Sequence, residues 1–262
     1  MRKLLFFFLA CQPWLAGAQE AKAPFVTTPA EVVDRMLRLA NTGASDYVVD
    51  LGSGDGRIVI AAARDYGARG LGVDLDPKLV ALSRESARRA GVADRARFEE
   101  RDVLLTDLSQ ATVVTIYLLP WLIDRLQPKL LAELRPGARI VTHAFGMVGW
   151  KPDRAETVRL SRPHEMQGGE SELFLWFVPA QARGEWRGGG WRLRVAQNFQ
   201  EIEIEAEQNG MARRVEQAKL EGKAISFGGP GFQFRGEVDD RRIAGTLEIS
   251  GRAQAMEFLR RP

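Results

Sequence analysis

Cysteine is almost absent from the 262-residue chain, which contains only Cys11. A chain with one cysteine cannot form an internal disulfide, and without the segment around Cys11 it also has no cysteine nucleophile or thiolate metal ligand. Histidine is nearly as rare, because the chain has only His143 and His164. Neither has a partner at metal-ligand spacing. We interpret them as a packed strand residue and a surface loop residue, and we predict no metal site.

A large excess of charge is also lacking. The 37 Lys and Arg residues nearly balance the 34 Asp and Glu residues, and Arg2 and Lys3 account for two of the three net positive charges. This balance does not predict a nucleic-acid-binding surface. With 45% apolar and 27% charged residues, the chain is typical of a globular protein with one sizeable domain and a small one.

The N-terminal segment has the pattern of a secretory signal. Arg2 and Lys3 precede the apolar residues 4–10, and Ala16-Gly17-Ala18 has the small-x-small pattern of a cleavage site. The apolar stretch is too short to span a bilayer, which needs roughly 20 residues. We therefore predict a signal peptide over residues 1–18 and export to the periplasm. The alternatives are an uncleaved membrane tether, a lipoprotein signal ending at Cys11, and a misassigned start.

Apolar strand patterns alternate with helical ones up to about residue 145. Helices are predicted at 29–41, 57–66, 77–90 and 121–134, and strands at 47–52, 70–75, 97–103, 112–119 and 138–145. This alternation predicts an α/β fold with a doubly wound parallel sheet covered on both faces. The segments 156–161 and 171–179 have no helical pattern between them, so we expect an antiparallel hairpin at one edge of that sheet.

The pattern changes after Pro179. Residues 181–190 contain four glycines and are predicted to be a linker. Beyond it, apolar and acidic residues alternate with a period of two, and Asn209-Gly210 is a turn signal. We predict a C-terminal antiparallel β-meander or small barrel of roughly six or seven strands from about Trp186 to Leu259, with Trp186 and Trp191 in its core. Residues 212–221 fit a helix as well, but the flanking glycines favour strand. The predicted division is 1–18, 19–180 and 181–262.

A glycine-rich turn joins the first strand to the second helix, in the stretch VVDLGSGDGRIVIAA at residues 48–62. Glycines at such a turn let a ligand approach the backbone, and the helix N-terminus favours an anionic group. A dinucleotide-binding turn would require a third glycine where Arg57 stands, and a P-loop would require Gly-Lys-Ser or Gly-Lys-Thr. Both are excluded. What remains is an acid, Asp50, followed by glycines at every second position.

This turn resembles motif I of the class I, seven-strand S-adenosylmethionine (SAM)-dependent methyltransferases, whose sheet is Rossmann-like. Asp74 ends the second strand, where its carboxylate can accept hydrogen bonds from both ribose hydroxyls. Asp102 follows the third strand, where the methyltransferase pattern has an acid that accepts from the adenine amino group. Because ligands bind at the carboxyl edge of α/β sheets, three acids at three successive strand ends predict a SAM site.

Four stretches resemble one group of these enzymes more closely: PFVTTPAEVVDRML, VDLGSGDGRIVIAAAR, VVTIYLLP and ARIVTHAFGMVGWKPD. They are similar to the protein-lysine methyltransferases that modify the ATP synthase c subunit and the adenine nucleotide translocase. The resemblance implies a protein-lysine N-methyltransferase whose substrate is a lysine in a protein, at a membrane in those relatives.

The resemblance also implies roles for individual residues. A loop containing Phe25, Thr27 and Thr28 would fold over the cofactor. The methionine end would be surrounded by Asp50, Gly52, Ser53, Gly54, Asp55, Gly56 and Arg57, the ribose would contact Asp74 and Leu75, and the adenine would contact Asp102 and Val103. Tyr117, Pro120 and Trp121 would line the substrate channel, with Trp150 beside it. Two alternatives stay open: a methyltransferase for a small molecule or lipid, and an exported binding protein that no longer turns over.

Overall fold

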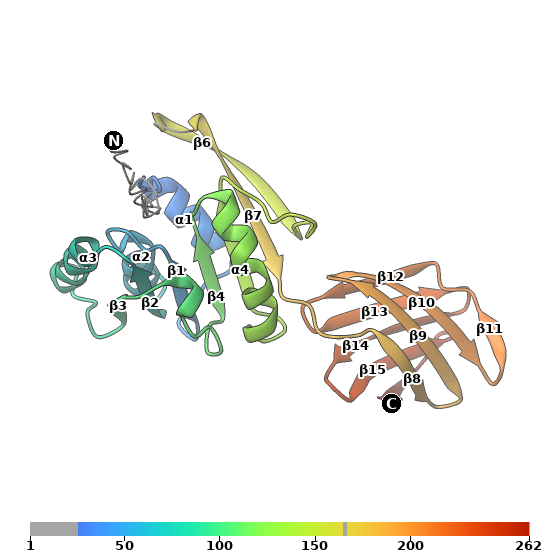
Figure 1. Ribbon diagram of the computed structural model, residues 1–262. Coiled ribbons are helices and arrows are strands. Elements are labelled where there is room, and N and C mark those ends of the chain that lie inside the picture. The colour runs from blue at the N-terminus through green and yellow to red at the C-terminus, as the bar shows by residue number, and fades with distance from the viewer. Residues whose placement is uncertain (1–25, 165–166, 262) are drawn as a thin grey trace, which may run out of the picture.

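The computed structural model of the protein describes residues 26–164 and 167–261, and Figure 1 shows two sheets that follow one another along the chain. The predicted signal peptide and Phe25 lie outside the described residues, so the export of the chain stays a prediction. Within those two ranges, no helix is both long enough and apolar enough to cross a membrane.

The first sheet has seven strands in the order β3-β2-β1-β4-β5-β7-β6. Its parallel strands are β1 (Tyr47–Leu51), β2 (Arg69–Asp74), β3 (Ala96–Glu100), β4 (Val113–Ile116) and β5 (Arg139–His143). The last two strands, β6 (Arg154–His164) and β7 (Gly168–Phe177), form an antiparallel hairpin in which β7 pairs with β5. The predicted α/β sheet and its hairpin edge are confirmed.

Helices cover both faces of this sheet because successive strand residues point to opposite sides. On one face, Val48 of β1 packs with α1 (Ala30–Leu39) and α2 (Arg57–Asp65), and α3 (Pro77–Arg89) packs beside α2. On the other face, Val49 packs with α4 (Pro120–Glu133). The short 3-10 helix η1 (Val103–Leu105) follows β3. The apolar spacing in the sequence therefore fixes which side of each helix is buried.

The second sheet is antiparallel and has nine strands in the order β11-β10-β9-β8-β16-β15-β14-β13-β12. These are β8 (Gly184–Gly188), β9 (Trp191–Asn198), β10 (Glu201–Gln208), β11 (Met211–Arg213), β12 (Gln217–Glu221), β13 (Ala224–Gly229), β14 (Phe232–Val238), β15 (Arg242–Ile249) and β16 (Arg252–Arg260). The sheet wraps around an apolar core that includes Trp186 and Trp191, as predicted. The predicted number of six or seven strands was too low, since residues 211–221 supply two short strands.

The prediction of a linker over residues 181–190 is wrong at β8. Trp186 in this strand is fully buried, and its Nε1 donates to the Ala182 carbonyl at 2.8 Å. A Cβ on Gly188 would lie 1.8 Å from the Glu257 carbonyl oxygen, so only glycine lets β8 pass this close to β16. Gly188, one of the glycines that suggested a flexible linker, therefore serves close packing within a sheet.

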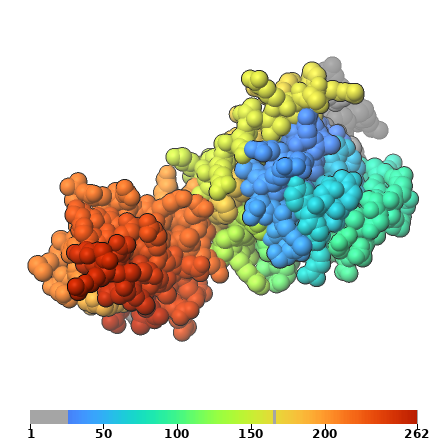
Figure 2. Space-filling model, turned by 180° about the vertical axis from the view of Figure 1, so that it is seen from behind, coloured from blue at the N-terminus to red at the C-terminus, as the bar shows by residue number. Residues whose placement is uncertain are grey.

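The two sheets meet at the turn between β9 and β10, and Figure 2 shows the orange-to-red C-terminal part in contact with the green and yellow part. Phe199 in this turn stacks on Trp150, with ring centroids 5.3 Å apart and planes 9° apart. Gln200 accepts from Trp150 Nε1 at 2.8 Å and donates to the Lys151 carbonyl at 2.6 Å. The contact thus joins the C-terminal sheet to the loop that follows β5.

Candidate functional site

A cavity of about 250 Å³ lies at the carboxyl ends of β1, β2 and β4. It brings together most of the residues that the sequence pointed to: Thr27, Thr28, Asp50, Gly52, Ser53, Gly54, Asp55, Arg57, Asp74, Leu75, Val103 and Tyr117. These residues come from five separate segments of the chain. The carboxyl edge of a parallel sheet is the place where α/β proteins bind ligands.

The glycine turn forms the floor of the cavity because its backbone is held close to β2. The amides of Gly52 and Ser53 both donate to the Val73 carbonyl at 2.9 Å. Gly52 has a φ of +81°, and a Cβ there would lie 2.6 Å from Leu118 Cδ2. A side chain at this position would therefore be strained and would crowd the cavity wall.

Asp74 is fixed at the end of β2 by two backbone amides. Its Oδ2 accepts from Gly54 N and its Oδ1 accepts from Asp76 N, both at 2.9 Å. Each carboxylate oxygen has two lone pairs, so one on each oxygen is left for a ligand hydroxyl. This geometry suits a pair of adjacent hydroxyls such as those of a ribose.

Asp50 is the most unusual acid of the site, since it is buried and lacks a cationic partner. Its Oδ1 accepts from Thr115 Oγ1 at 2.7 Å, and within the described residues no salt bridge reaches it. Burial above all, with a contribution from the charges of Asp74 and Asp55, raises the pKa of Asp50 to about 7, although the hydrogen bond from Thr115 opposes this shift. A buried carboxyl in this state gains most from a ligand that brings a positive charge.

Ser53 is a second unusual polar residue of the cavity wall. Its residue is 6% exposed, and its Oγ has no hydrogen-bond partner among the described residues. Because an unsatisfied buried hydroxyl is costly, a polar ligand group in the cavity is expected to satisfy it. Asp50 and Ser53 together indicate a ligand that is both cationic and hydrogen-bonding at this end.

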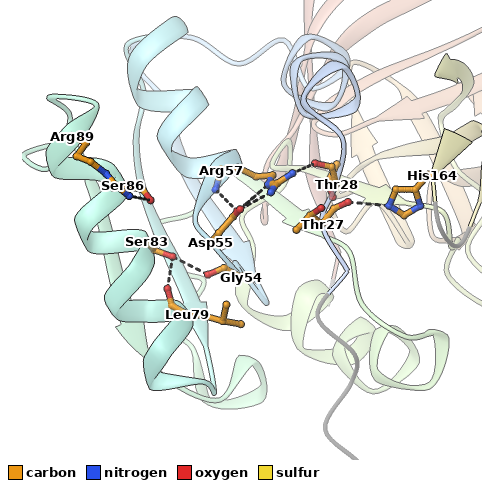
Figure 3. A network of polar contacts seen from close by, with 10 residues as sticks. All are labelled: Thr27, Thr28, Gly54, Asp55, Arg57, Leu79, Ser83, Ser86, Arg89 and His164. Carbon is orange, nitrogen blue, oxygen red and sulfur yellow. Dashed lines mark hydrogen bonds and ion pairs between the residues drawn. The ribbon is translucent and has the colours of Figure 1, made fainter. Parts of the chain in front are cut away.

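The loop over the cavity is held from two sides, as Figure 3 shows. On one side, Arg57 Nη1 donates to the Thr28 carbonyl at 2.7 Å while the same guanidinium pairs with Asp55 at 2.5 Å. On the other side, His164 Nε2 donates to the Thr27 carbonyl at 3.0 Å. Burial alone would raise the pKa of Asp55, but the hydrogen bonds and charge of Arg57 hold it below its usual value. Arg57 therefore ties the glycine turn to this loop.

The opposite wall of the cavity is apolar. It consists of Tyr117, Leu118, Leu119, Leu122 and Phe145, from the ends of β4 and β5 and the start of α4. Of the predicted channel residues, Tyr117 lines the cavity, whereas Pro120 and Trp121 lie outside its lining at the start of α4, where the residue Trp121 is 52% exposed. The apolar wall can exclude water from a reacting group.

Two other predicted residues lie next to the cavity without lining it. Gly56 is the left-handed residue before α2, with a φ of +81°. Asp102 caps η1 by accepting from Leu104 N at 2.8 Å, while its neighbour Val103 lines the cavity. The role of Asp102 toward an adenine therefore stays a prediction.

Trp150, which was predicted beside the channel, does not line the cavity. The loop after β5 folds back through a bridge between Met147 and Trp150. Trp150 is 1% exposed and packs in the core below α4, with Phe199 stacked on it. Its role is to join the two sheets.

The two histidines also lie near the site, which their sequence context did not indicate. His143 is a fully buried residue at the end of β5, as predicted. His164 was predicted in a surface loop, but it is the last residue of β6 and is half-buried against the loop that covers the cavity. The pairing of β7 with both β5 and β6 brings the two histidines together. This pairing cannot be inferred from the residues next to each histidine in the sequence.

Five lining residues lie outside the segments to which the sequence pointed, 25–28, 50–57, 74–75, 102–103 and 117–121: Ile58, Asp76, Leu79, Leu122 and Phe145. All of them lie within about six residues of the end of a predicted strand, at the edge where α/β sheets bind ligands. Apolar side chains at such positions look like ordinary helix-core residues. Their position shortly after the ends of predicted strands could have indicated them, because that position places them at the same sheet edge as the acids.

Comparisons with known proteins agree with this geometry. A family described as the ANTKMT methyltransferase domain matches residues 50–154. A protein-lysine N-methyltransferase of Saccharolobus islandicus is 42% identical over 130 residues, which cover 49% of this chain and 81% of that protein. The chain belongs to the protein-lysine N-methyltransferase family.

This methyltransferase is also similar to other proteins that use the same cofactor chemistry. The lysine N-methyltransferase of the ATP synthase c subunit from Xenopus laevis is 42% identical over 154 residues, covering 57% of this chain and 66% of that protein. The crystal structure of an RNA methyltransferase from Salinibacter ruber in complex with S-adenosyl-L-homocysteine has a TM-score of 0.53 and 48% identity. It covers 58% of this chain and 93% of that one.

The chain is therefore a SAM-dependent methyltransferase with SAM as its cofactor, and its site fits that molecule. Asp50 offers a buried carboxyl to a cation, and Ser53 offers an unsatisfied hydroxyl to a polar group of the ligand. Asp74 has two free lone pairs that can accept from vicinal hydroxyls. No cluster of three or more His, Cys, Asp or Glu side chains within residues 26–164 and 167–261 could hold a metal ion.

Proposed function

We propose that this methyltransferase modifies the side-chain amine of a lysine in a protein. Two relatives with 42% identity are named as lysine N-methyltransferases, one of them for the ATP synthase c subunit. The observation on the chain itself that supports the proposal is the apolar wall of Tyr117, Leu118, Leu119, Leu122 and Phe145. These residues line the same cavity as Asp50 and Asp74.

An apolar wall is what a lysine substrate requires. The attacking amine must be neutral, and with a reference pKa near 10.4 its deprotonation at about pH 7 costs roughly 4 to 5 kcal/mol. Removing the ammonium from water lowers its pKa and reduces that cost. Tyr117 is the one wall residue with a polar group, and burial raises its pKa above 10, so its hydroxyl stays protonated.

The transfer itself requires alignment more than a dedicated catalytic group. When bound, SAM would supply a methyl group on a sulfonium, whose sulfur would leave as the thioether of S-adenosylhomocysteine when the lysine nitrogen accepts the methyl group. The lysine ammonium first loses one proton to water, and the product is a methylated ammonium. The chain contributes a fixed floor at the glycine turn, a held loop at Thr27 and Thr28, and exclusion of water by the apolar wall.

RNA is the second candidate substrate. It is favoured by the likeness to the RNA methyltransferase of Salinibacter ruber, which is 48% identical to this chain. The net charge of +3 over 262 residues does not provide the strong basic excess of many RNA-binding proteins. We therefore place RNA second to a protein lysine as the substrate. One experiment distinguishes the two substrates.

The experiment uses purified protein, SAM labelled in its methyl group, and a lysate of the source cells. After incubation the lysate is separated into protein, RNA and small-molecule fractions, and labelled protein is hydrolysed for amino-acid analysis. We expect label in protein and its recovery as methyl-lysine. Label in RNA alone, or in the small-molecule fraction alone, would contradict the proposal.

Two variants make this test specific. Asp74→Ala removes a predicted cofactor contact and is expected to lower labelling about tenfold or more when the SAM concentration is kept below its Kd. Asp65→Ala makes the same chemical change at the end of α2, where the carboxylate forms only a surface ion pair with Arg64. This control should label the same fraction as the unmodified protein.

A further inference from the structure

A partly buried polar network adjoins the cavity wall at Tyr117. The Tyr117 ring packs on the His143 ring, with centroids 4.1 Å apart and planes 39° apart. Gln167, between the two strands of the β6–β7 hairpin, donates from Nε2 to the Tyr117 hydroxyl oxygen at 3.1 Å. The Oε1 of the same amide lies 3.1 Å from His143 Nε2. Gln167 therefore bridges the tyrosine and the histidine.

The hydrogen-bonding roles in this network are mutually consistent. Because Gln167 Oε1 can only accept, His143 carries its proton on Nε2 and donates it there. The other nitrogen, Nδ1, is then an acceptor for the hydroxyl of Thr28, which lies 3.2 Å away. Ser171 Oγ of β7 lies 3.2 Å from Nε2 on the same side as Gln167.

His143 is suited to a permanent structural link of this kind. Burial lowers its pKa to about 4, so the ring is neutral near physiological pH and keeps one donor and one acceptor nitrogen. Its two partners belong to opposite parts of the cavity, since Thr28 lies in the covering loop and Tyr117 in the apolar wall. The side chain thus connects the two walls from behind.

We propose that Gln167 and His143 are positioning residues for methyl transfer, and that they act by holding the Tyr117 hydroxyl toward the substrate amine. This inference rests on the proposed lysine substrate. With one lone pair occupied by Gln167, the Tyr117 oxygen keeps a second lone pair for an N–H of the incoming amine. When the Tyr117 oxygen accepts this N–H, the rotation of the amine is fixed. The lone pair of the amine nitrogen is then directed toward the methyl group.

A double-mutant cycle tests whether Gln167 acts through Tyr117. The variants are Tyr117→Phe, which removes only the hydroxyl, Gln167→Leu, which removes the amide at similar volume, and their combination. We expect each single change to lower kcat by about three- to tenfold, the value of one hydrogen bond. The double variant should be no slower than Tyr117→Phe alone, because the second change has nothing left to position.

Multiplication of the two effects in the double variant would overturn the proposal. A merely structural role for Gln167 would show itself as a lowered melting temperature and an equal loss in both backgrounds. Glu170→Ala, an exposed change on the same hairpin with a 3.6 Å contact to Arg159, is the matched control and should leave kcat unchanged.

The cycle is measured as release of S-adenosylhomocysteine with whichever fraction accepts the methyl group. If RNA is the acceptor, the lysine substrate is refuted while the coupling of Gln167 to Tyr117 is still measured. If protein is the acceptor and the two effects multiply, the positioning role fails and the proposed function stands. SAM affinity should change less than about twofold in Gln167→Leu, because the amide does not line the cavity.

Discussion

The buried Asp50 carboxyl predicts that SAM binding depends on pH. Ionisation of Asp50 in the ligand-free cavity is costly, since its pKa lies at about 7 against a reference of 3.8. This difference corresponds to roughly 4 kcal/mol. A cationic ligand beside the carboxylate offsets that cost, so we expect SAM to bind the ionised form.

The size of the effect follows from the pKa. With a pKa of about 7, roughly one Asp50 in eleven is ionised near pH 6 and ten in eleven near pH 8. The Kd for SAM should therefore be about tenfold higher near pH 6 than near pH 8 on account of this group. Isothermal titration calorimetry at both pH values measures the ratio directly.

Asp50→Asn provides the control because it keeps the shape of the side chain and an oxygen for the Thr115 hydroxyl. The amino group of SAM also titrates near this range, but it does so equally with both proteins. The ratio of the Kd near pH 6 to the Kd near pH 8 should therefore be about tenfold larger for the unmodified protein than for the variant. A Kd ratio that is the same in both proteins would refute the reasoning from burial.

The stability of the ligand-free protein should change in the opposite sense. The folded-state pKa of Asp50 lies above its unfolded value, so the folded state holds the proton more tightly between pH 3.8 and about 7. This group therefore stabilises the fold at low pH and loses that contribution as the pH rises through about 7. The rise in melting temperature on adding SAM should accordingly be larger above that pH.

Three further predictions concern other parts of the chain. Asp74→Ala should raise the Kd for SAM about tenfold or more by calorimetry, whereas Asp65→Ala should not change it. Trp150→Ala removes a buried indole at the contact between the sheets and should lower the free energy of unfolding by about 3 to 5 kcal/mol in urea, whereas Gln200→Ala should cost only about 1 kcal/mol. N-terminal sequencing of protein purified from fractionated cells should find residue 19 first if the signal peptide is cleaved, and Met1 would contradict that prediction.

The parallel sheet and the cavity edge could be predicted because their signals are local. Strand and helix periods are written in consecutive residues, and Asp50 and Asp74 each stand at the end of an apolar run. Parallel strands then place their carboxyl ends at one edge without further information. The same rule put the glycine turn and both acids in one cavity.

The other features depend on partners that are distant in the chain. Trp150 contacts a turn 49 residues later, so its neighbours in the sequence say nothing of its direction. His143, His164 and Gln167 meet only because β7 pairs between β5 and β6. Glycines at β8 were interpreted as flexible because the close approach of β16 lies 69 residues away.

The most direct test of the account is a crystal structure of the protein with S-adenosylhomocysteine. It should show the ribose hydroxyls on the Asp74 carboxylate, and the amino acid end of the ligand against Asp50 and Ser53. A ligand bound elsewhere, or one in the cavity whose cationic end points away from Asp50, would contradict the account.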